Sequence, residues 1–243
     1  MHTTMPKPTV LITGASSGIG AATARLLTTV GHRVVLVARS QDKLTALCRE
    51  LGPLASAIPM DLTIPAEVVA LGDRAEAAAG NIGVVFANAG SFIAGDLVDG
   101  DPEHWAAGID LNITALCRTL RATVPHLVAR KSGHVIITSS VAGRRWIQGQ
   151  TIYCATKAAV SAIAEGLRRE MIPHGIRVSL ISPGWVSSEF WDGTISTQAL
   201  EQARADQQAI TSEDIANAVR YAIEQPPQVT ISEIMIHPLR QAH

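Results

Sequence analysis

Short runs of apolar, often β-branched residues alternate along the chain with longer stretches in which apolar positions recur every three to four residues. The first apolar run, residues 9–13, precedes a stretch at 18–30 that places Ile19, Ala22 and Leu26 on one helical face. The alternation continues to the end of the chain. It predicts strands at 9–13, 32–38, 55–60, 83–87, 133–139, 176–181 and 233–237, and helices at 18–30, 41–51, 65–79, 102–130, 150–172 and 212–224.

Strands that alternate with long helices are typical of βαβ units, which build a parallel sheet covered on both faces. Such crossovers are right-handed, so helices cover both faces only if the chain extends the sheet from its centre first to one edge and then to the other. We therefore predict a single-domain α/β doubly wound Rossmann fold over residues 1–243, with about seven parallel strands and helices on both faces. Residues 185–210 lack a clear period, and a segment of that length favours a substrate loop or lid.

Composition and charge narrow the function classes. The formal net charge of −1 gives no electrostatic footprint for nucleic acid or an anionic membrane. No apolar run is long enough to span a bilayer, and the first eight residues do not resemble a signal peptide. The three cysteines, Cys48, Cys117 and Cys154, have neither disulfide-framework nor metal-site spacing. These features predict a cytoplasmic protein without a metal, a nucleic-acid partner or a membrane partner.

A glycine-rich turn follows the first predicted strand and opens the first predicted helix. Glycines there allow a sharp turn and a close approach to a pyrophosphate, and the helix offers free N–H groups to the anion. The spacing is G-x-x-x-G-x-G, and the place of the turn in the alternation favours a nucleotide site. The expected cofactor contacts in this turn are Gly14, Ser16, Ser17, Gly18, Ile19 and Gly20.

The residue at the tip of the second predicted strand points to the kind of dinucleotide. An acidic residue there binds the ribose hydroxyls of NAD, but this chain has Arg39. A guanidinium matches a 2′-phosphate, and the alternative is a solvated surface arginine. We therefore expect NADP(H), with NAD less favoured. Arg39 also argues against a methyltransferase, which would need an acidic ribose ligand there.

Tyr153 and Lys157 lie four residues apart in the predicted helix 150–172, and so on one face of it. A nearby ammonium favours the charged form of a phenol, so we expect Lys157 to lower the pKa of Tyr153. A phenol tuned in this way suits general acid–base catalysis. The same spacing also occurs by chance in solvated helices, so the pair needs support from the rest of the chain.

The motifs together resemble the short-chain dehydrogenase/reductase family over essentially the whole chain. The order and spacing match its compact, NADP-preferring members, which are about as long as this chain. The first Asn of the family's Asn-Asn-Ala-Gly motif is replaced by Ala87, and Ser188 stands where Thr is common. The residues that carry the resemblance are the turn at 13–20, Asn88-Ala89-Gly90, Asn112, Ser140, Tyr153, Lys157 and Pro183-Gly184.

The resemblance implies a catalytic group. Tyr153 would donate and accept the proton, while Lys157 would tune it and bind the nicotinamide ribose. Ser140 would hydrogen-bond the substrate oxygen, and Asn112 would hold water in a relay to Lys157. Ser139 competes with Ser140, but the spacing to the tyrosine favours Ser140.

The resemblance also implies further cofactor contacts. Asp61, with Leu62 beside it, would face the adenine, and the segment 88–90 would lie beneath the cofactor. The segment 183–188 would border the nicotinamide amide. The residues concerned are Asp61, Leu62, Asn88, Ala89, Gly90, Pro183, Gly184, Val186 and Ser188, besides Tyr153 and Lys157.

These features predict an NADP(H)-dependent oxidoreductase that interconverts an alcohol and a carbonyl; the alternatives are a cofactor-binding regulator without turnover, or the same chemistry with NAD. The chain end around 224–234 resembles members acting on serine and other 3-hydroxy acids, and a homodimer or homotetramer is expected. Trp146, Trp185, Phe190 and Trp191 either line the substrate pocket or pack the lid. Arg144 and Arg145 either hold a substrate anion or are solvated. Our candidate substrate residues are Ser140, Arg144, Trp146, Trp185 and Trp191.

Overall fold

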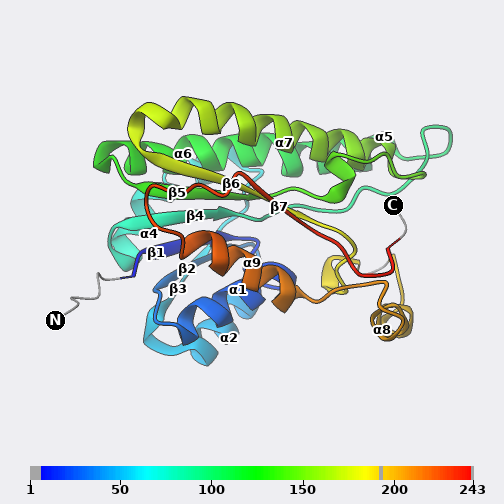
Figure 1. The fold of residues 1–243 in the computed structure, drawn as a ribbon, viewed down its shortest axis with the longest axis horizontal. Helices are drawn as coiled ribbons and strands as arrows, with labels where there is room; N and C mark the ends of the chain where they lie inside the picture. Colours follow the sequence, from blue (N-terminus) through cyan, green and yellow to red (C-terminus); the bar gives the residue numbers. More distant parts are fainter. Residues whose placement is uncertain (1–6, 192–193, 242–243) are drawn as a thin grey trace.

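The computed structural model describes residues 7–191 and 194–241 and shows one parallel seven-stranded sheet among them (Figure 1). The strand order is β3-β2-β1-β4-β5-β6-β7, so the order reverses between β1 and β4. This confirms the predicted doubly wound α/β Rossmann fold with helices on both faces. The strands are β1 (Thr9–Thr13), β2 (Val34–Ala38), β3 (Ala55–Pro59), β4 (Ile82–Ala87), β5 (Gly133–Thr138), β6 (Ile176–Pro183) and β7 (Glu233–Ile236).

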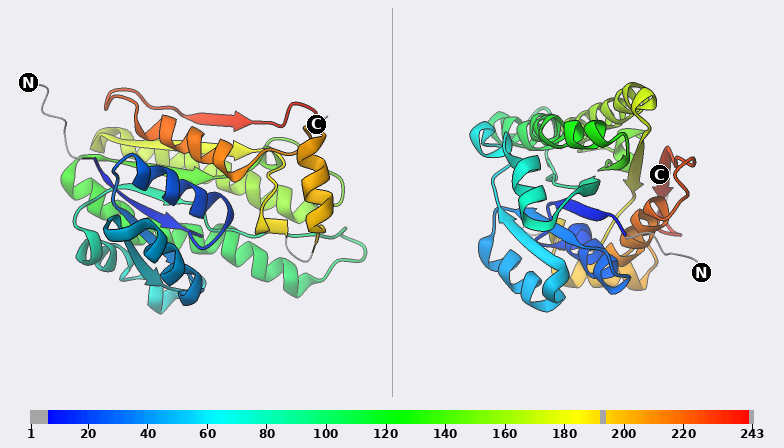
Figure 2. Two further views of the ribbon diagram at one scale, coloured as in Figure 1. Left: turned by 90° about the horizontal axis from the view of Figure 1, so that it is seen from below. Right: turned by 90° about the vertical axis from the view of Figure 1, so that its left-hand side faces the viewer.

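Two helical layers cover the sheet, as Figures 1 and 2 show. The layer with α6 and α7 lies above the sheet in Figure 1, and the layer with α1, α2 and α9 lies below it. The helices are α1 (Gly18–Thr29), α2 (Gln41–Leu51), α3 (Pro65–Val68), α4 (Leu71–Ala79), α5 (Pro102–Ile109), α6 (Ala115–Arg130), α7 (Thr151–Met171), α8 (Thr197–Ala205) and α9 (Ser212–Ile223).

The period-2 alternation of each strand divides the core between these layers. In β1, Val10 and Ile12 pack in the cluster that includes side chains of α1, α2 and α9, while Leu11 packs in the cluster on the side of α4, α6 and α7. All three side chains are fully buried. Burial on both faces explains why the strands read as continuous apolar runs.

Three predicted elements differ from the structure. Residues 65–79 form two helices, α3 and α4, and not one. The helical stretch at 102–130 continues past Gly108 but has a π-helical turn at Asp110–Thr114. In such a turn the backbone hydrogen bonds join residues five apart in place of four. The segment 185–210 is not a continuous loop, because it contains α8 and pairs Val186 with Ile210. Its role as a substrate lid stays a prediction.

The sheet topology determines where a ligand can bind. In parallel sheets a crevice opens at the carboxyl ends of the strands where the strand order reverses, here between β1 and β4. Within residues 7–191 and 194–241 no helix is long and apolar enough to cross a bilayer. The same residues contain no group of three or more His, Cys, Asp or Glu side chains arranged to hold a metal ion.

Candidate active site

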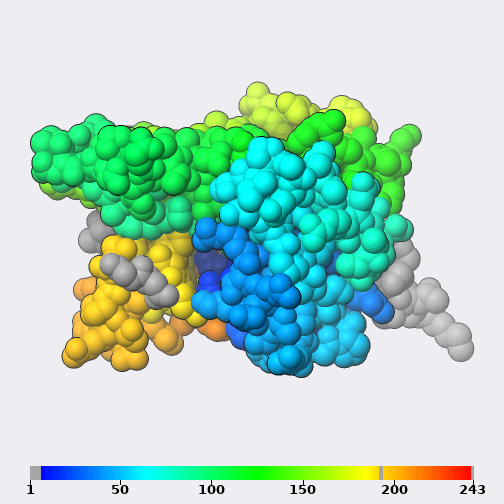
Figure 3. Space-filling view, turned by 180° about the vertical axis from the view of Figure 1, so that it is seen from behind, coloured from blue at the N-terminus to red at the C-terminus, as the bar shows by residue number. Residues whose placement is uncertain are grey.

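A cleft of about 1190 Å³ opens at this edge of the sheet. Its volume exceeds the roughly 300–1,000 Å³ of ordinary small-ligand pockets, which suits a large cofactor together with a substrate. In Figure 3 the surface is hollowed between the yellow segment before α8 and the blue residues near α2. Except for Gly20 and Asn112, all of the expected catalytic and cofactor-binding residues line this cleft.

The turn from β1 into α1 forms the floor of the cleft. Gly14 has a φ of +65°, and a Cβ atom there would lie 2.9 Å from the backbone Cα of Ala89. A Cβ on Gly20 would clash with the carbonyl oxygen of Gly14, so Gly20 brings the helix against the turn without lining the cleft itself. The glycines therefore allow the sharp turn and its close packing against Ala89 and the start of α1.

Hydrogen bonds join this turn to the ends of two neighbouring strands. The Thr13 hydroxyl accepts from the backbone N–H groups of Asn88 (3.0 Å) and Ala89 (3.1 Å). The side-chain amide of Asn88 donates to the Thr13 carbonyl at 3.2 Å and accepts from the Thr138 hydroxyl at 3.1 Å. Asn88 thus ties β1 to β5 beneath the cleft, although the motif lacks the family's first asparagine.

The π turn positions Asn112. Its carboxamide accepts from the Ser91 N–H at 2.8 Å and donates to the Ser91 carbonyl at 2.9 Å and to the Thr156 hydroxyl at 3.3 Å. A Cβ on Gly90 would lie 3.0 Å from the Asn112 Oδ1 and 3.6 Å from the Lys157 Nζ, so both side chains converge over Gly90. Asn112 is buried and fastens the loop after β4 to α7.

Tyr153 and Lys157 are buried in the first two turns of α7. The Lys157 Nζ lies 5.8 Å from the centre of the Tyr153 ring and donates to the Thr138 carbonyl at 3.2 Å. The spacing of the pair on one helical face is as expected. The phenol and the ammonium therefore meet at the base of the cleft.

The expected direction of the Tyr153 pKa shift was wrong. Burial raises the pKa of the phenol, although a hydrogen bond with Ser140 acts in the opposite direction. Burial also lowers the pKa of Lys157 to about 8. Removal from water disfavours the charged form of each group and is the largest cause of both pKa shifts. Tyr153 is therefore a protonated phenol at neutral pH, the form needed to donate a proton.

The structure distinguishes the two serines after β5. The Ser139 hydroxyl is buried and interacts with the Lys157 carbonyl and the Ser161 hydroxyl, both at 3.0 Å. The Ser140 hydroxyl is half-buried; it accepts from the Ala142 N–H at 3.1 Å and makes a long contact of 3.4 Å to the Pro183 carbonyl. Ser139 therefore supports α7, whereas the Ser140 hydroxyl faces Tyr153 in the cleft.

The end of the cleft beside β2 and α2 carries positive charge, where the adenosine of a dinucleotide was expected. Arg39 is exposed at the tip of β2, and Lys43, which sequence analysis missed, lines the same wall one turn into α2. The Asp61 carboxylate accepts from the hydroxyl (2.7 Å) and the N–H (2.9 Å) of Thr63, and these bonds, with the charge of Arg39, lower its pKa. The amphipathic period of α2 could have indicated Lys43, because it lies one turn beyond Ser40.

The opposite wall is formed by residues 183–188. The Gln241 Oε1 accepts from the Trp185 N–H at 3.1 Å, and a Cβ on Gly184 would collide with that same oxygen. Gly184 therefore allows the C-terminal segment to pack directly against this wall. Val186 and Ser188 continue along it.

The expected substrate residues separate into two groups. Trp185 and Trp191 line the cleft, and the Trp191 indole donates to the Val186 carbonyl at 2.8 Å. Arg144 and Trp146 do not line it: Arg144 pairs with Glu233 at 3.0 Å, and Trp146 is 77% exposed. Arg144 and Trp146 follow Ser140 closely in the sequence, but their side chains do not line the cleft that the Ser140 hydroxyl faces. Phe92, which follows the Asn88–Gly90 segment, lines the cleft and was missed.

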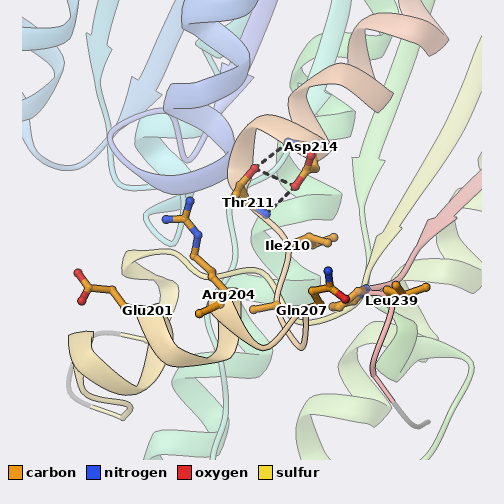
Figure 4. Close-up of a pocket in the computed structure, with 10 residues that line it drawn as sticks. Glu201, Arg204, Gln207, Ile210, Thr211, Asp214 and Leu239 are labelled. Carbon is orange, nitrogen blue, oxygen red and sulfur yellow. Dashed lines mark hydrogen bonds between the residues drawn. The ribbon is translucent and has the colours of Figure 1, made fainter.

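A second hollow of about 620 Å³ lies outside the cleft, between α8, the start of α9 and the C-terminal segment (Figure 4). The Asp214 carboxylate accepts from the N–H (2.8 Å) and the hydroxyl (2.9 Å) of Thr211, which caps α9. The Arg240 N–H donates to the Gln207 carbonyl at 3.0 Å. Thr211 and Asp214 therefore form the N-terminal capping box of α9, and their polar groups are satisfied by each other.

Comparison with known proteins agrees with this geometry. A family model described as "short chain dehydrogenase" matches residues 8–199. An uncharacterised oxidoreductase of Staphylococcus aureus strain N315 is 36% identical over 230 residues, which cover 94% of this chain and 96% of that protein. A serine dehydrogenase solved in its closed form with NADP+ matches with a TM-score of 0.89 and 30% identity, covering 97% of this chain and 96% of the other. A metagenomic short-chain oxidoreductase in complex with NADP matches with a TM-score of 0.79 and 34% identity, covering 95% and 96%.

The match extends from β1 to α8 and so includes the phosphate turn, the Tyr153–Lys157 pair and the wall at 183–188. The resemblance inferred from the motifs is confirmed over the same residues. The chain belongs to the short-chain dehydrogenase family and is an oxidoreductase.

Proposed function

We propose that this protein is an NADP(H)-dependent oxidoreductase that interconverts an alcohol and a carbonyl compound. The observation that carries the proposal is the convergence of Ser140, Tyr153 and Lys157 at one end of a cleft whose other end presents Arg39. A protonated phenol at the reacting end and cations at the adenosine end are what such a reaction needs.

Two observations support the binding of a dinucleotide in the cleft. The turn after β1 lines the cleft, and the Gly18 N–H already donates to a carboxylate, that of Glu189, at 3.1 Å. That N–H is therefore directed at a position an anion can occupy, as a pyrophosphate would. The turn at 14–19 would hold the phosphates, Asp61 and Leu62 the adenine, and residues 183–188 the nicotinamide. The nicotinamide supplies the hydride when bound.

The protein's own residues would move and hold the proton. In reduction, Tyr153 donates its phenolic proton to the carbonyl oxygen while the Ser140 hydroxyl hydrogen-bonds the same oxygen. Lys157, as an ammonium, stabilises the phenolate that remains. Asn112 holds the Ser91 backbone and keeps the floor beside Lys157 in place.

NADP is favoured over NAD by Arg39, which Lys43 and the N-terminus of α2 support. A guanidinium, an ammonium and a helix N-terminus together suit a 2′-phosphate. The two solved relatives described above bind NADP+ or NADP. NAD-dependent use of the same chemistry remains the alternative for the cofactor test.

Substrate and assembly extend the proposal. The likeness to a serine dehydrogenase makes serine and other 3-hydroxy acids, with their 3-oxo products, one substrate class to be tested. We also propose a homodimer or homotetramer formed through α6 and α7, the outer helices that follow Asn112 and carry Tyr153. Sedimentation of the purified protein measures this assembly directly.

The proposal is tested by a screen for NADPH oxidation. The panel holds aldehydes, ketones, 3-oxo acids and sulfonated aldehydes, and NADH serves as the parallel cofactor. We expect turnover with NADPH and at least one carbonyl compound. Tight NADPH binding without turnover on any of them would favour the alternative, a cofactor-binding regulator.

The pKa of Lys157 predicts how the reaction responds to pH. A cation with a pKa lowered to about 8 is neutral above that pH, so kcat/KM for reduction should fall as the pH rises through about 8. In Lys157→Arg the charge persists across this range, so the residual activity should lose this fall. Initial rates over the neutral and alkaline range measure both profiles. A wild-type profile that stays flat there would contradict the assignment.

A further inference from the structure

Aromatic side chains are scarce in this chain but concentrated at one place. The sequence has three Phe, four Trp and two Tyr. Five of these nine rings surround the reacting end of the cleft. They are Phe92, Tyr153, Trp185, Phe190 and Trp191, here called the ring cluster.

The rings are in mutual contact around Phe92 and Trp191. The Phe92 and Trp191 centroids are 4.7 Å apart, and Phe92 and Tyr153 meet edge to face at 5.2 Å. Phe190 lies 5.4 Å from Trp191 and 6.3 Å from Tyr153. These separations are those of interacting aromatic pairs. The phenol of Tyr153 therefore lies at the base of an aromatic wall.

Tyr153 and Phe92 pack with Ile93 in a small buried cluster, but Trp185, Phe190 and Trp191 lie outside the core clusters. Phe190 is 37% exposed, and Phe92, Trp185 and Trp191 are half-buried. The rings come from the loop after β4, from α7 and from the loop after β6, and all of them line the cleft. A half-exposed apolar surface of this kind beside a proton donor is typical of a binding site.

The positive charges that line the cleft lie at its adenosine end, at its buried base and at its rim. Arg39 and Lys43 line the adenosine end, and Lys157 is buried against the Thr138 carbonyl. At the reacting end the cleft wall includes Arg240 and His104, both exposed at its rim. A small hydroxy acid would need a cation held beside the reacting carbon to orient its carboxylate. Among the described lining residues the rings, and not such a cation, surround that position.

We propose that the substrate is a carbonyl compound, or its alcohol, that carries an aromatic ring next to the reacting carbon. The ring would pack against the wall formed by Phe92, Phe190 and Trp191, with the oxygen directed at Tyr153 and Ser140. The carbon gains a hydride from the cofactor, the oxygen gains a proton from Tyr153, and the C=O bond becomes CH–OH. This inference rests on the proposed function and specifies its substrate class.

The test compares matched substrates with NADPH as the common cofactor. Aryl ketones and aryl aldehydes are compared with their cyclohexyl and methyl counterparts, and serine oxidation with NADP+ is measured alongside. We expect kcat/KM for the aryl compound to exceed that for its methyl counterpart and for serine by at least about tenfold. A single additional ring contact corresponds to a factor of this order.

Two tryptophan variants locate the effect. Trp191→Leu should lower the aryl-to-methyl ratio of kcat/KM by about tenfold when both substrates are measured at saturating NADPH. Trp146→Leu is the matched control, because that ring is 77% exposed and outside the cleft. Titration calorimetry of the NADP+ complex with an aryl alcohol gives a second, activity-free readout of the same preference.

The outcomes are separable. A preference for serine or a methyl ketone over aryl compounds would overturn the aromatic substrate and leave the proposed reaction standing. An equal loss for all substrates in Trp191→Leu would do the same. Absence of turnover with every compound would overturn the proposed function and this inference with it.

A second inference rests on a different contact. The Gly18 N–H, at the start of α1, donates to the Glu189 Oε2 at 3.1 Å across 171 positions of sequence. The Ser188 Cβ would be 3.5 Å from a Cβ on Gly18, so the backbone of this segment also lies close to the turn. Residues 188–191, here called the latch, carry both Glu189 and the two rings Phe190 and Trp191.

The Glu189 carboxylate lies where the phosphates of the cofactor are expected. The N-terminus of α1 can attract either the Glu189 carboxylate or a cofactor phosphate. With 12 residues, α1 is long enough to have a substantial dipole. The two anions therefore compete for the same N–H group. Release of Glu189 would also release the rings that pack over Tyr153, because they follow it directly in the chain.

We infer that Glu189 is an internal anion that holds the latch against the phosphate turn until the cofactor displaces it. The cofactor would thus bind first and open the ring cluster for the substrate. The inference rests on the proposed cofactor site, but its test does not use turnover.

The test measures NADP+ affinity and backbone protection together. In Glu189→Ala the Kd for NADP+ should fall about two- to fivefold, the range expected for one anion at a helix N-terminus. Amide exchange at residues 186–191 should be faster in this variant than in the wild type without NADP+. Glu201→Gln, an exposed carboxylate on α8, is the control and should change neither. A tighter Kd without faster exchange would mean simple charge repulsion and would overturn the latch, as would no change in either.

Discussion

Replacing Tyr153 with phenylalanine should lower kcat for carbonyl reduction by about 100- to 10,000-fold, the range that general acid–base catalysis contributes. The variant keeps the ring in its contact with Phe92, 5.2 Å away, so packing is preserved. What it loses is the proton that burial keeps on the phenol at neutral pH. Initial rates under saturating NADPH measure the effect.

Two measurements control this prediction. The Kd for NADPH should be within about twofold of wild type, because Lys157 and the phosphate turn are unchanged. Tyr221→Phe, on the exposed face of α9, makes the same chemical change far from the cleft and should leave kcat unchanged. An unchanged kcat in Tyr153→Phe would remove the phenol from the mechanism.

Replacing Arg39 with aspartate should move the NADPH/NADH ratio of kcat/KM toward NADH by about 100-fold. The change removes hydrogen bonds to a charged phosphate, each contributing about 1.5–3 kcal/mol, and adds a carboxylate that repels it. The same carboxylate can accept from the ribose hydroxyls of NADH. Steady-state rates with both cofactors at matched substrate concentration give the ratio.

The control is Arg33→Asp, which makes the same charge change just before β2, at the opposite end of the strand. It should leave the ratio as in the wild type. A ratio that Arg39→Asp does not shift would refute the role of Arg39. It would point to Lys43 as the dominant phosphate ligand, which Lys43→Ala would then test.

The fold could be predicted from the sequence because each strand is buried on both faces. An uninterrupted apolar run such as β2, followed by an amphipathic helix, is compatible with few folds other than a parallel sheet between helical layers. The observed β2 begins two residues later than predicted. The π turn at Asp110–Thr114 could not be predicted. It coincides with the contact between Asn112 and Ser91, which lie 21 positions apart, and no local pattern relates the two.

The site could be predicted where residues act through local spacing. Tyr153 and Lys157 share a helical face whether the helix is exposed or buried, so their proximity could be predicted. The direction of their pKa shifts depends on burial, which the spacing does not give. Arg144 and Trp146 follow Ser140 in sequence but leave the cleft, because the short helical turn at Val141–Gly143 redirects the chain.

The residues missed by sequence analysis have the longest-range contacts. Glu189 meets Gly18 across 171 positions, and no local pattern relates the two. Phe92 acquires its importance from Trp191, on a segment almost a hundred positions away. Such contacts depend on how the sheet edge brings the loops together, which only the tertiary fold determines.

The unequal distribution of the tryptophans gives this protein a built-in optical probe. Trp185 and Trp191 line the cleft, whereas Trp105 does not line it and Trp146 is largely in water. In Trp146→Phe the solvent-exposed emission at long wavelength would be removed, leaving a spectrum weighted toward the cleft. Ligand entry could then be followed in milliseconds by stopped-flow fluorescence, without a label and before any bond is made or broken.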